Sequence, residues 1–394
     1  MTLQFPPDFR FGTSTAATQI ETASAHNWRG LRSRDGYVFD RTTDHELRRA
    51  EDAEHAARLG NYYRGGVDWA RLQPEPLGAF VPEVVAEYRE FFEALRERGC
   101  DLLFVVHHFT NPLWLEERGG WTTTFAITAY LDFCRRCVEA FGDLVWNWNT
   151  FNEPNVYALN GYLTGEFPPH RRSRIDLGTR VLRHMGKAHE QAYALIKGYY
   201  PNAPVGISLN TCWFEGLSLR GRMAAKFTDW WFHEVAARQF TTCDYWGLSY
   251  YAYIPFDPGP ITYVDTPEEV ERRGLPHSRL WCHRPEGLAR NLRRFSAKYG
   301  KPLLVTESGI CTDDPEVRIA AVTNYLKGCH ALLEEGIPLL GYTHWSTWDN
   351  FEWALGPTYR FGLLRLNLDT MERENTPAAD WYAEVVRTKE VEVG

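Results

Sequence analysis

The chain has 394 residues, of which 44% are hydrophobic and 24% are charged, a composition typical of a globular protein with a large core. Its 43 basic and 51 acidic residues give a formal net charge of −8, which argues against nucleic acid or an anionic membrane as the main partner. The chain has no run of about 18 apolar residues and no secretory leader pattern at its start, so we expect no transmembrane helix and a cytoplasmic location.

Short β-rich segments alternate with longer helical segments along the chain. The expected strands cover residues 9–14, 62–69, 102–109, 145–151, 205–209, 245–251, 303–306 and 340–345. Between them apolar residues recur near the helical period, and the expected helices include residues 84–98, 126–141, 180–199, 285–299 and 316–335. The segment 254–278, rich in Pro and Gly, is expected to form a long loop after the sixth strand.

Eight strand-then-helix units in series predict a parallel sheet. An open doubly wound sheet is possible, but eight units in a chain of this length favour an α/β fold of a single (β/α)8 TIM barrel, with residues 1–394 as one domain. The sequence F-G-T-S-T at 11–15 lacks the G-x-G-x-x-G pattern of a dinucleotide-binding loop. We expect neither a cofactor nor a metal, because the cysteine and histidine spacings match no common metal site.

Tryptophan is unusually frequent, with 15 residues in an aromatic content of 14%. An indole offers a flat apolar face and one N–H donor, which suits the hydrophobic face of a pyranose ring. A Trp-rich core is the alternative explanation. The eight cysteines are scattered, several within apolar segments, and are expected to be buried thiols of a reducing compartment.

Polar residues gather where the expected strands end, and in a barrel the active site lies at the C-terminal ends of the strands. In strand order these residues are Gln19 and Glu21, Arg64, His108, Asn152 and Glu153, Asn210, Tyr251, Glu307, and Trp345. Two glutamates on different strands suit cleavage of a glycosidic bond. One carboxyl protonates the leaving oxygen while the other attacks the anomeric carbon. A single such Glu would more often be an ordinary surface carboxylate, but the joint pattern favours a catalytic pair.

Several motifs, in order along almost the whole chain, resemble glycoside hydrolase family 1, which includes β-glucosidases and β-galactosidases. The motifs are F-P-P-D-F-R-F-G at 5–12, A-T-Q-I-E at 17–21, T-F-N-E-P at 150–154, P-E-G-L at 285–288, V-T-E-S-G at 305–309, W-S at 345–346, D-N-F-E-W at 349–353 and R-F-G at 360–362. The resemblance implies a TIM barrel and a retaining exo-β-glycosidase that hydrolyses terminal β-glucosides, and β-galactosides or β-fucosides as well, through a covalent glycosyl-enzyme.

The resemblance also implies a role for each matching residue. Glu153 would be the general acid and then the general base, and Glu307 the nucleophile. Arg64 and Tyr251 would support the charged nucleophile. The residues expected to bind the sugar are Gln19, His108, Asn152, Tyr251, Trp345, Glu352 and Trp353.

The chain departs from the family pattern beside the nucleophile. Ser308 stands where the family has Asn after the nucleophile, and Ser249 stands where it usually has Asn in N-Y-Y. Both changes fall in the hydrogen-bonding surroundings of Glu307. The retaining mechanism further predicts that the carboxyl groups of Glu153 and Glu307 lie about 5 to 5.5 Å apart.

Three other functions remain open. The same carboxylates serve an enzyme that transfers the glycosyl group to alcohols or sugars, because acceptors compete with water. A 6-phospho-β-glycosidase is disfavoured, since the charge of Glu352 would repel a phosphate and Tyr359 replaces the Lys of that branch. A non-catalytic sugar-binding protein is disfavoured because both glutamates are present. Small β-glycosides are the expected partners, and a homo-oligomer is possible.

Overall fold

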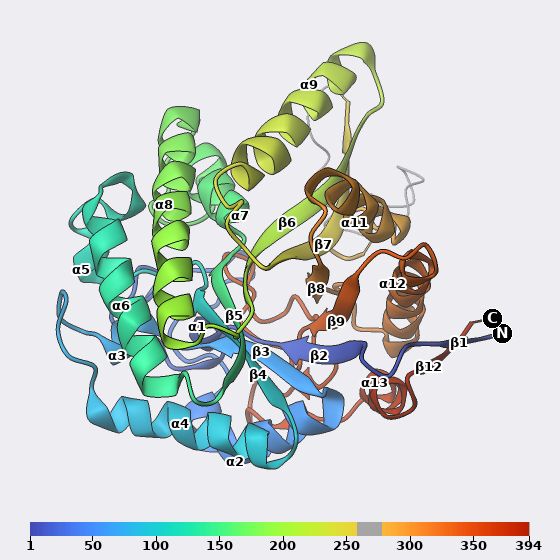
Figure 1. Cartoon of the computed structure of the whole chain (residues 1–394), viewed down its shortest axis with the longest axis horizontal. Coiled ribbons are helices and arrows are strands. Elements are labelled where there is room, and N and C mark those ends of the chain that lie inside the picture. The colour runs from blue at the N-terminus through green and yellow to red at the C-terminus, as the bar shows by residue number, and fades with distance from the viewer. Residues whose placement is uncertain (258–277, 394) are drawn as a thin grey trace.

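The computed structural model describes residues 1–257 and 278–393. Within them eight parallel strands close into a barrel, with each strand hydrogen-bonded to the next and the last paired with the first (Figure 1). The barrel strands are β2 (Arg10–Ser14), β3 (Tyr62–Gly66), β4 (Asp101–His107), β5 (Val145–Asn152), β6 (Val205–Gly216), β7 (Tyr245–Phe256), β8 (Leu303–Ser308) and β9 (Leu339–Trp345). The predicted (β/α)8 fold is confirmed.

Helices surround the barrel and cover its outer face (Figure 1). The longer ones are α2 (His45–Leu59), α4 (Pro82–Glu97), α6 (Phe125–Phe141), α8 (Ile175–Tyr199), α9 (Leu219–Asp229), α11 (Glu286–Tyr299), α12 (Pro315–Glu334) and α13 (Pro377–Thr388). Short helices at the strand ends are α1 (Ala17–Ile20), α3 (Trp69–Leu72), α5 (Leu113–Glu116), η1 (Gly120–Thr122), α7 (Pro154–Leu159), η2 (Asn160–Thr164) and η3 (Trp230–Val235). The five helices expected from the sequence are all present, with shifts of a few residues at their ends.

Local sequence explains where several elements begin and end. The second strand was expected to continue to residue 69 but stops at Gly66. Asp68 begins α3 there, because its side chain accepts hydrogen bonds from the backbone N–H groups of Ala70 and Arg71. In α4, apolar side chains at helical spacing turn Tyr88, Phe91, Phe92 and Leu95 toward the barrel.

The strands β6 and β7 are longer than the sequence predicted. They continue to pair with each other beyond the barrel rim, with Trp213 opposite Tyr253 and Gly216 opposite Phe256. Residues 254–256, expected to begin a loop, therefore belong to a strand. The rest of that expected loop, up to residue 277, lies outside the described residues. The extension raises α9 above the barrel on the side where the strands end (Figure 1).

The main core lies between the strands and the helices, and a smaller apolar cluster fills the barrel interior. The interior cluster consists of Tyr62, Leu103, Val105, Tyr245 and Leu304. All eight cysteines are thiols, seven of them buried and Cys212 half-buried, as expected. The two chain ends meet in a small antiparallel sheet of β1 (Thr2–Gln4) and β12 (Glu390–Glu392).

Candidate active site

The predicted site residues lie together at the C-terminal end of the barrel. They lie on or just after seven of the eight barrel strands, so the closed sheet brings side chains from positions 19 to 353 to one place. Glu153 and Glu307, the two predicted catalytic carboxyls, are each only 4% exposed. The charge of Glu307 raises the pKa of Glu153, and both carboxyls raise the pKa of Tyr251, which places the three side chains in one electrostatic unit.

Both carboxylate oxygens of Glu307 have partners. The guanidinium of Arg64, on β3, donates to Oε1, and the hydroxyl of Tyr251, on β7, donates to Oε2 at 2.8 Å. Burial raises the pKa of Glu307, and the positive charge of Arg64 together with the Tyr251 hydroxyl opposes that rise. Despite the departures at Ser249 and Ser308, each oxygen of this carboxylate keeps one hydrogen-bond partner.

Arg64 also links Glu307 to Asn152, and through Asn152 to His108. Its Nη2 donates to Oδ1 of Asn152 at 2.6 Å, and Nδ2 of Asn152 lies 2.9 Å from Nε2 of His108. Because an amide N–H is a donor, this imidazole nitrogen accepts. Burial lowers the pKa of His108 well below its usual value, so the ring is neutral. A neutral His108 keeps its other ring nitrogen available as a donor to a sugar hydroxyl.

Glu153 stands immediately before α7, with Pro154 as the first helical residue. Its backbone is left-handed, with φ of 42°, which turns the chain sharply at the end of β5. Burial, and next the charge of Glu307, raises the pKa of Glu153 to about 8, while hydrogen bonding from Asn210 opposes the rise. Near neutral pH this carboxyl is protonated and can donate a proton.

Gln19, Trp345 and Glu352 line the site near β2 and the last strand. Gln19, on α1, donates from Nε2 to Asn350 Oδ1 at 3.0 Å, to the carbonyl of Phe351 at 2.9 Å and to Glu352 Oε2 at 3.5 Å. Its Oε1 is buried and has no hydrogen-bond partner among the described residues, so it is available to a ligand hydroxyl. Burial raises the pKa of Glu352 to about 8, and hydrogen bonding from Trp345 opposes the rise.

Aromatic rings form one wall of the site. The ring of His108 lies 5.7 Å from Trp353, nearly parallel to it, and 5.9 Å from Trp345. Trp353 has a left-handed backbone with φ of 44° and packs against Trp28 at 4.9 Å. These flat faces suit a pyranose ring, and the expected pair of site tryptophans is brought together.

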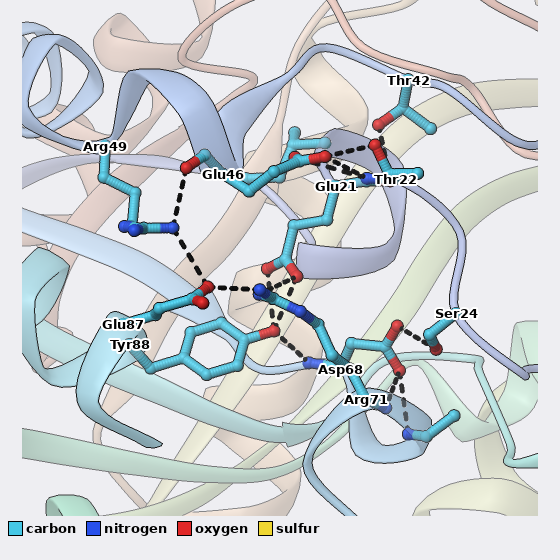
Figure 2. A network of polar contacts seen from close by, with 12 residues as sticks. Glu21, Thr22, Ser24, Thr42, Glu46, Arg49, Asp68, Arg71, Glu87 and Tyr88 are labelled. Carbon is cyan, nitrogen blue, oxygen red and sulfur yellow. Dashed lines mark hydrogen bonds and ion pairs between the residues drawn. The ribbon is translucent and has the colours of Figure 1, made fainter. Parts of the chain in front are cut away.

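Behind Gln19 a buried polar network fixes the segment that carries it (Figure 2). The hydroxyl of Tyr88, on α4, donates to the carboxyl of Glu21 at 2.8 Å, and Arg71, on α3, approaches it at 3.3 Å. Burial raises the pKa of Glu21 to about 8, and Arg71 opposes the rise. Arg71 also binds Glu87, so the loop after β2 is joined to two helices.

The contact between Asn210 and Glu153 was not predicted from the sequence. Asn210 follows the expected fifth strand, and its Nδ2 donates to Glu153 Oε1 at 2.9 Å. Its strand-end position was the only signal for a role in the sequence. Among the described residues no cluster of three or more His, Cys, Asp or Glu is arranged to hold a metal ion, and no helix there is both long and apolar enough to cross a lipid bilayer.

A (β/α)8 barrel with paired carboxyls, amides and aromatics at its mouth defines an enzyme that cleaves glycosidic bonds. The profile of glycosyl hydrolase family 1 matches residues 1–238 and 226–391. The chain belongs to glycosyl hydrolase family 1, as its motifs indicated, and it is an enzyme of the glycoside hydrolase class.

Relatives of known name cover nearly the full length of the chain. It is 28% identical over 448 residues to beta-glucosidase A of Thermotoga maritima, with 99% of each chain covered. It is similar in structure to a beta-glycosidase from Pyrococcus horikoshii, with 30% identity, a TM-score of 0.88 and coverage of 100% of this chain and 97% of that one. A beta-glucosidase from Thermotoga maritima in complex with deoxynojirimycin has 26% identity and a TM-score of 0.89, with 99% of this chain and 100% of that one covered.

Proposed function

We propose that the enzyme is a retaining exo-β-glycosidase that hydrolyses terminal β-glucosides. The observation that carries the proposal is the contrast between the two buried carboxyls. Glu307 is held by the cation Arg64 and by Tyr251, as a nucleophile must be, whereas burial and the charge of Glu307 raise the pKa of Glu153 to about 8. Carboxyl groups in different environments take different roles.

The reaction then proceeds in two displacements. Glu153 protonates the glycosidic oxygen as Glu307 attacks the anomeric carbon, and the aglycone leaves with that proton. Glu153, now a carboxylate, removes a proton from water, and the water oxygen displaces Glu307 from the anomeric carbon. Asn152, held between Arg64 and His108, is placed to bind the 2-hydroxyl, a contact that strengthens as positive charge develops on the ring.

Hydroxyl recognition supports a glucoside and tolerates a galactoside. Gln19 and Glu352 offer an unpartnered amide oxygen and a carboxyl side by side, which can bind a 4-hydroxyl in either configuration. The Thermotoga maritima beta-glucosidase of similar structure forms a complex with deoxynojirimycin, which supports a sugar-like ligand for this enzyme. Transfer to an alcohol in place of water uses the same residues, and product analysis with added alcohol measures its share.

Azide rescue tests the two roles. We expect Glu153→Ala to lose on the order of 10²–10⁴-fold in rate on aryl β-glucosides with poor leaving groups, and Glu307→Ala to lose on the order of 10⁴-fold or more on any of them. An activated aryl β-glucoside, which needs no proton donor, is the substrate for the rescue itself. Azide should give the β-glycosyl azide with the first variant and the α-glycosyl azide with the second. Full activity in either variant, or the same azide anomer from both, would contradict the assignment.

A 6-phosphorylated substrate is the alternative that the site favours least. Burial raises the pKa of Glu352 to about 8, so its charge repels a phosphate mainly above that pH, and the side chain offers no cation to bind one. We expect p-nitrophenyl β-glucoside to be cleaved faster than its 6-phosphate at every pH. Faster cleavage of the phosphate would reverse this assignment.

A further inference from the structure

The pairing of β6 with β7 is irregular just after Asn210, where β7 contains one residue more than β6. The pairing of β6 with β7 shifts register between Thr211 and Trp213, so the backbone of Cys212 leaves the regular ladder. Its N–H donates instead to Nε2 of His233, on η3, at 3.2 Å. Nδ1 of His233 lies 2.9 Å from Asp229, so the imidazole is held with Nε2 as the acceptor. The backbone of Cys212 is therefore held by a buried side chain and not by the neighbouring strand.

The thiol of Cys212 lies against the side chain of Asn210, two residues earlier on the same strand. Sγ lies 3.3 Å from Oδ1 of Asn210, and between these two atoms only the thiol carries a hydrogen to donate. Burial raises the pKa of the Cys212 thiol, which stays protonated and remains a donor. A donor facing Oδ1 leaves Nδ2 on the other side of the amide, where it reaches Glu153 Oε1 at 2.9 Å.

The rest of Asn210 is equally constrained. Its backbone N–H donates to Asn155 Oδ1 at 3.2 Å, and Nδ2 of Asn155 donates to the carbonyl of Asn210 at 2.8 Å. These bonds fix the backbone but do not distinguish the two orientations of the side-chain amide. When Glu153 is ionised, it can only accept and so selects Nδ2 itself. When Glu153 is protonated, it could also donate to Oδ1, and the thiol is then the group that favours the observed orientation, because its S–H donates to Oδ1.

We propose that Cys212 is a positioning residue for the proton donor, whose thiol orients the Asn210 amide so that Nδ2 donates to Glu153. The inference rests on the proposed function, since it takes Glu153 as the acid and base. The hydrogen bond favours the ionised carboxylate that must form when the aglycone leaves and must then act as base on water. With the amide reversed, the Glu153 proton would be held by Oδ1 and given up less readily.

Charged groups from several strands also act on Glu153 and are unchanged by the substitutions below. Glu307 on β8 raises its pKa, Arg64 on β3 lowers it, and Tyr251 on β7 faces both carboxyls. Any shift on changing Cys212 is thus measured against a constant background.

The test compares Cys212→Ala with Cys212→Ser across a series of aryl β-glucosides. Removing the donor should move the alkaline limb of the kcat/KM profile up by roughly one pH unit, the size expected for one hydrogen bond to a charged group. It should slow poor leaving groups by about tenfold for the same reason and leave the dinitrophenyl glucoside unchanged, since that leaving group needs no proton. In Cys212→Ser the hydroxyl can donate in place of the thiol, so we expect the alkaline limb and the rates on poor leaving groups to stay close to those of the wild type.

Two controls separate orientation from general destabilisation. Cys134→Ala removes a fully buried thiol from α6, a helix on the outside of the barrel, and should lower stability without moving the pH limb. In an Asn210→Ala background, Cys212→Ala should add nothing, because the thiol acts only through that amide. An unshifted limb in Cys212→Ala, additive effects of the two changes, or a Ser variant that behaves like Ala would overturn the inference.

The same series separates this inference from the proposed function. If Glu153→Ala keeps its activity on poor leaving groups, the acid assignment itself is wrong. If Glu153→Ala loses it as proposed while Cys212→Ala matches the wild type, only the positioning role of Cys212 fails. If Cys212→Ala does not fold, the alkaline limb can still be compared between Cys212→Ser, which keeps a donor to Asn210, and Asn210→Ala, which removes the amide.

Discussion

At the scale of single residues, charge is unevenly shared within the site. Three carboxyls surround it, the buried Glu153 and Glu307 and the half-buried Glu352, and the one cation that contacts any of them among the described residues is Arg64, which binds Glu307. Burial raises the pKa of all three. The carboxyl beside the cation is therefore the one best able to carry a negative charge when the site is empty.

Replacing Arg64 tests that arrangement. In Arg64→Gln the carboxylate of Glu307 keeps only Tyr251, so its pKa should rise and the acidic limb of kcat/KM should move to higher pH. We expect kcat/KM to fall on the order of 10²–10³-fold, as for loss of one preorganised charge contact. Arg64→Lys keeps the charge and should keep the acidic limb close to that of the wild type. An acidic limb unchanged in the Gln variant would show that Arg64 does not control the charge of Glu307.

Glu21 provides a test through stability. Burial raises its pKa in the folded protein to about 8, so from about pH 5 to pH 8 the folded state binds a proton that the unfolded state releases, and stability falls as pH rises. Gln cannot ionise, so the melting temperature of Glu21→Gln relative to the wild type should increase over this range by roughly a few degrees. Calorimetry of both proteins at the two ends of the range measures the difference.

Glu335→Gln is the matched control for that measurement. Glu335 is exposed, and hydrogen bonding from Arg293 lowers its pKa, so it is ionised throughout the same range and its variant should show a constant difference. If Glu21→Gln instead loses stability relative to the wild type as pH rises, the contact with Arg71 holds Glu21 ionised and the network of Figure 2 is an ion-pair network.

Most residues of the site could be placed from the sequence because the motifs at 150–154 and 305–309 end strands, and strand ends converge in any closed barrel. The contact of Asn210 with Glu153 could not be predicted in this way. It depends on an amide orientation and on a contact with the thiol of Cys212, and neither leaves a periodic signal in the sequence.

At the scale of elements, a glycine sets how closely α11 packs. Gly287, in the P-E-G-L motif, lies against the ring and hydroxyl of Tyr250 on β7, where a Cβ atom would overlap both. The motif therefore has a packing explanation. It lets the helix lie directly on the strand that carries Tyr251, the partner of Glu307.

We expect Gly287→Ala to lower the free energy of unfolding by about 1–3 kcal/mol, as for overpacking of a filled core. At Gly198, within α8, a Cβ atom would meet no other atom within 4 Å, so Gly198→Ala should instead stabilise by about 0.5–1 kcal/mol. Urea unfolding of the two variants compares them directly. Equal effects would mean that helix propensity, and not contact with Tyr250, governs both positions.

The order and type of the elements followed from hydrophobic periodicity, but some boundaries did not. The ends of β6 and β7 were placed too early because, beyond the barrel, the two strands stabilise each other through pairs such as Trp213 and Tyr253. Such pairing joins segments far apart along the chain and is not visible in either segment alone.

At the scale of the whole molecule, the two ends of the barrel have separate tasks. The catalytic groups lie where the strands end, whereas β1 and β12 pair beside the start of β2, with Phe5 N–H donating to the carbonyl of Lys389. Val391 and Val393 are buried in this contact. The closure of the chain ends therefore contributes to stability at a distance from the chemistry.

Deleting residues 390–394 should accordingly lower the free energy of unfolding by on the order of 3–5 kcal/mol, the contribution of two buried valines. We expect kcat/KM at about 25 °C to stay within about twofold of the full chain, because no site residue contacts this sheet. Val391→Ala should reproduce part of the loss, and the exposed neighbour Glu390→Ala should not. A large loss of kcat/KM with unchanged stability would contradict this division.

The closed barrel could be predicted because eight units in one series exhaust the chain, and the open sheet was the only competitor. The aromatic content was explained in both of the proposed ways. Trp345 and Trp353 line the site, while five others are fully buried: Trp28, Trp121, Trp148, Trp246 and Trp348.

The buried thiols allow local opening of the folded enzyme to be measured at several places in the barrel. A thiol-specific reagent reaches a buried sulfur only when the surrounding structure opens, so each labelling rate measures the free energy of one opening event. Cys134 and Cys137 report on α6, Cys329 on α12 and Cys212 on the rim of β6. Mass spectrometry of partly labelled protein would thus show in which order the sectors of the barrel open, without any introduced cysteine.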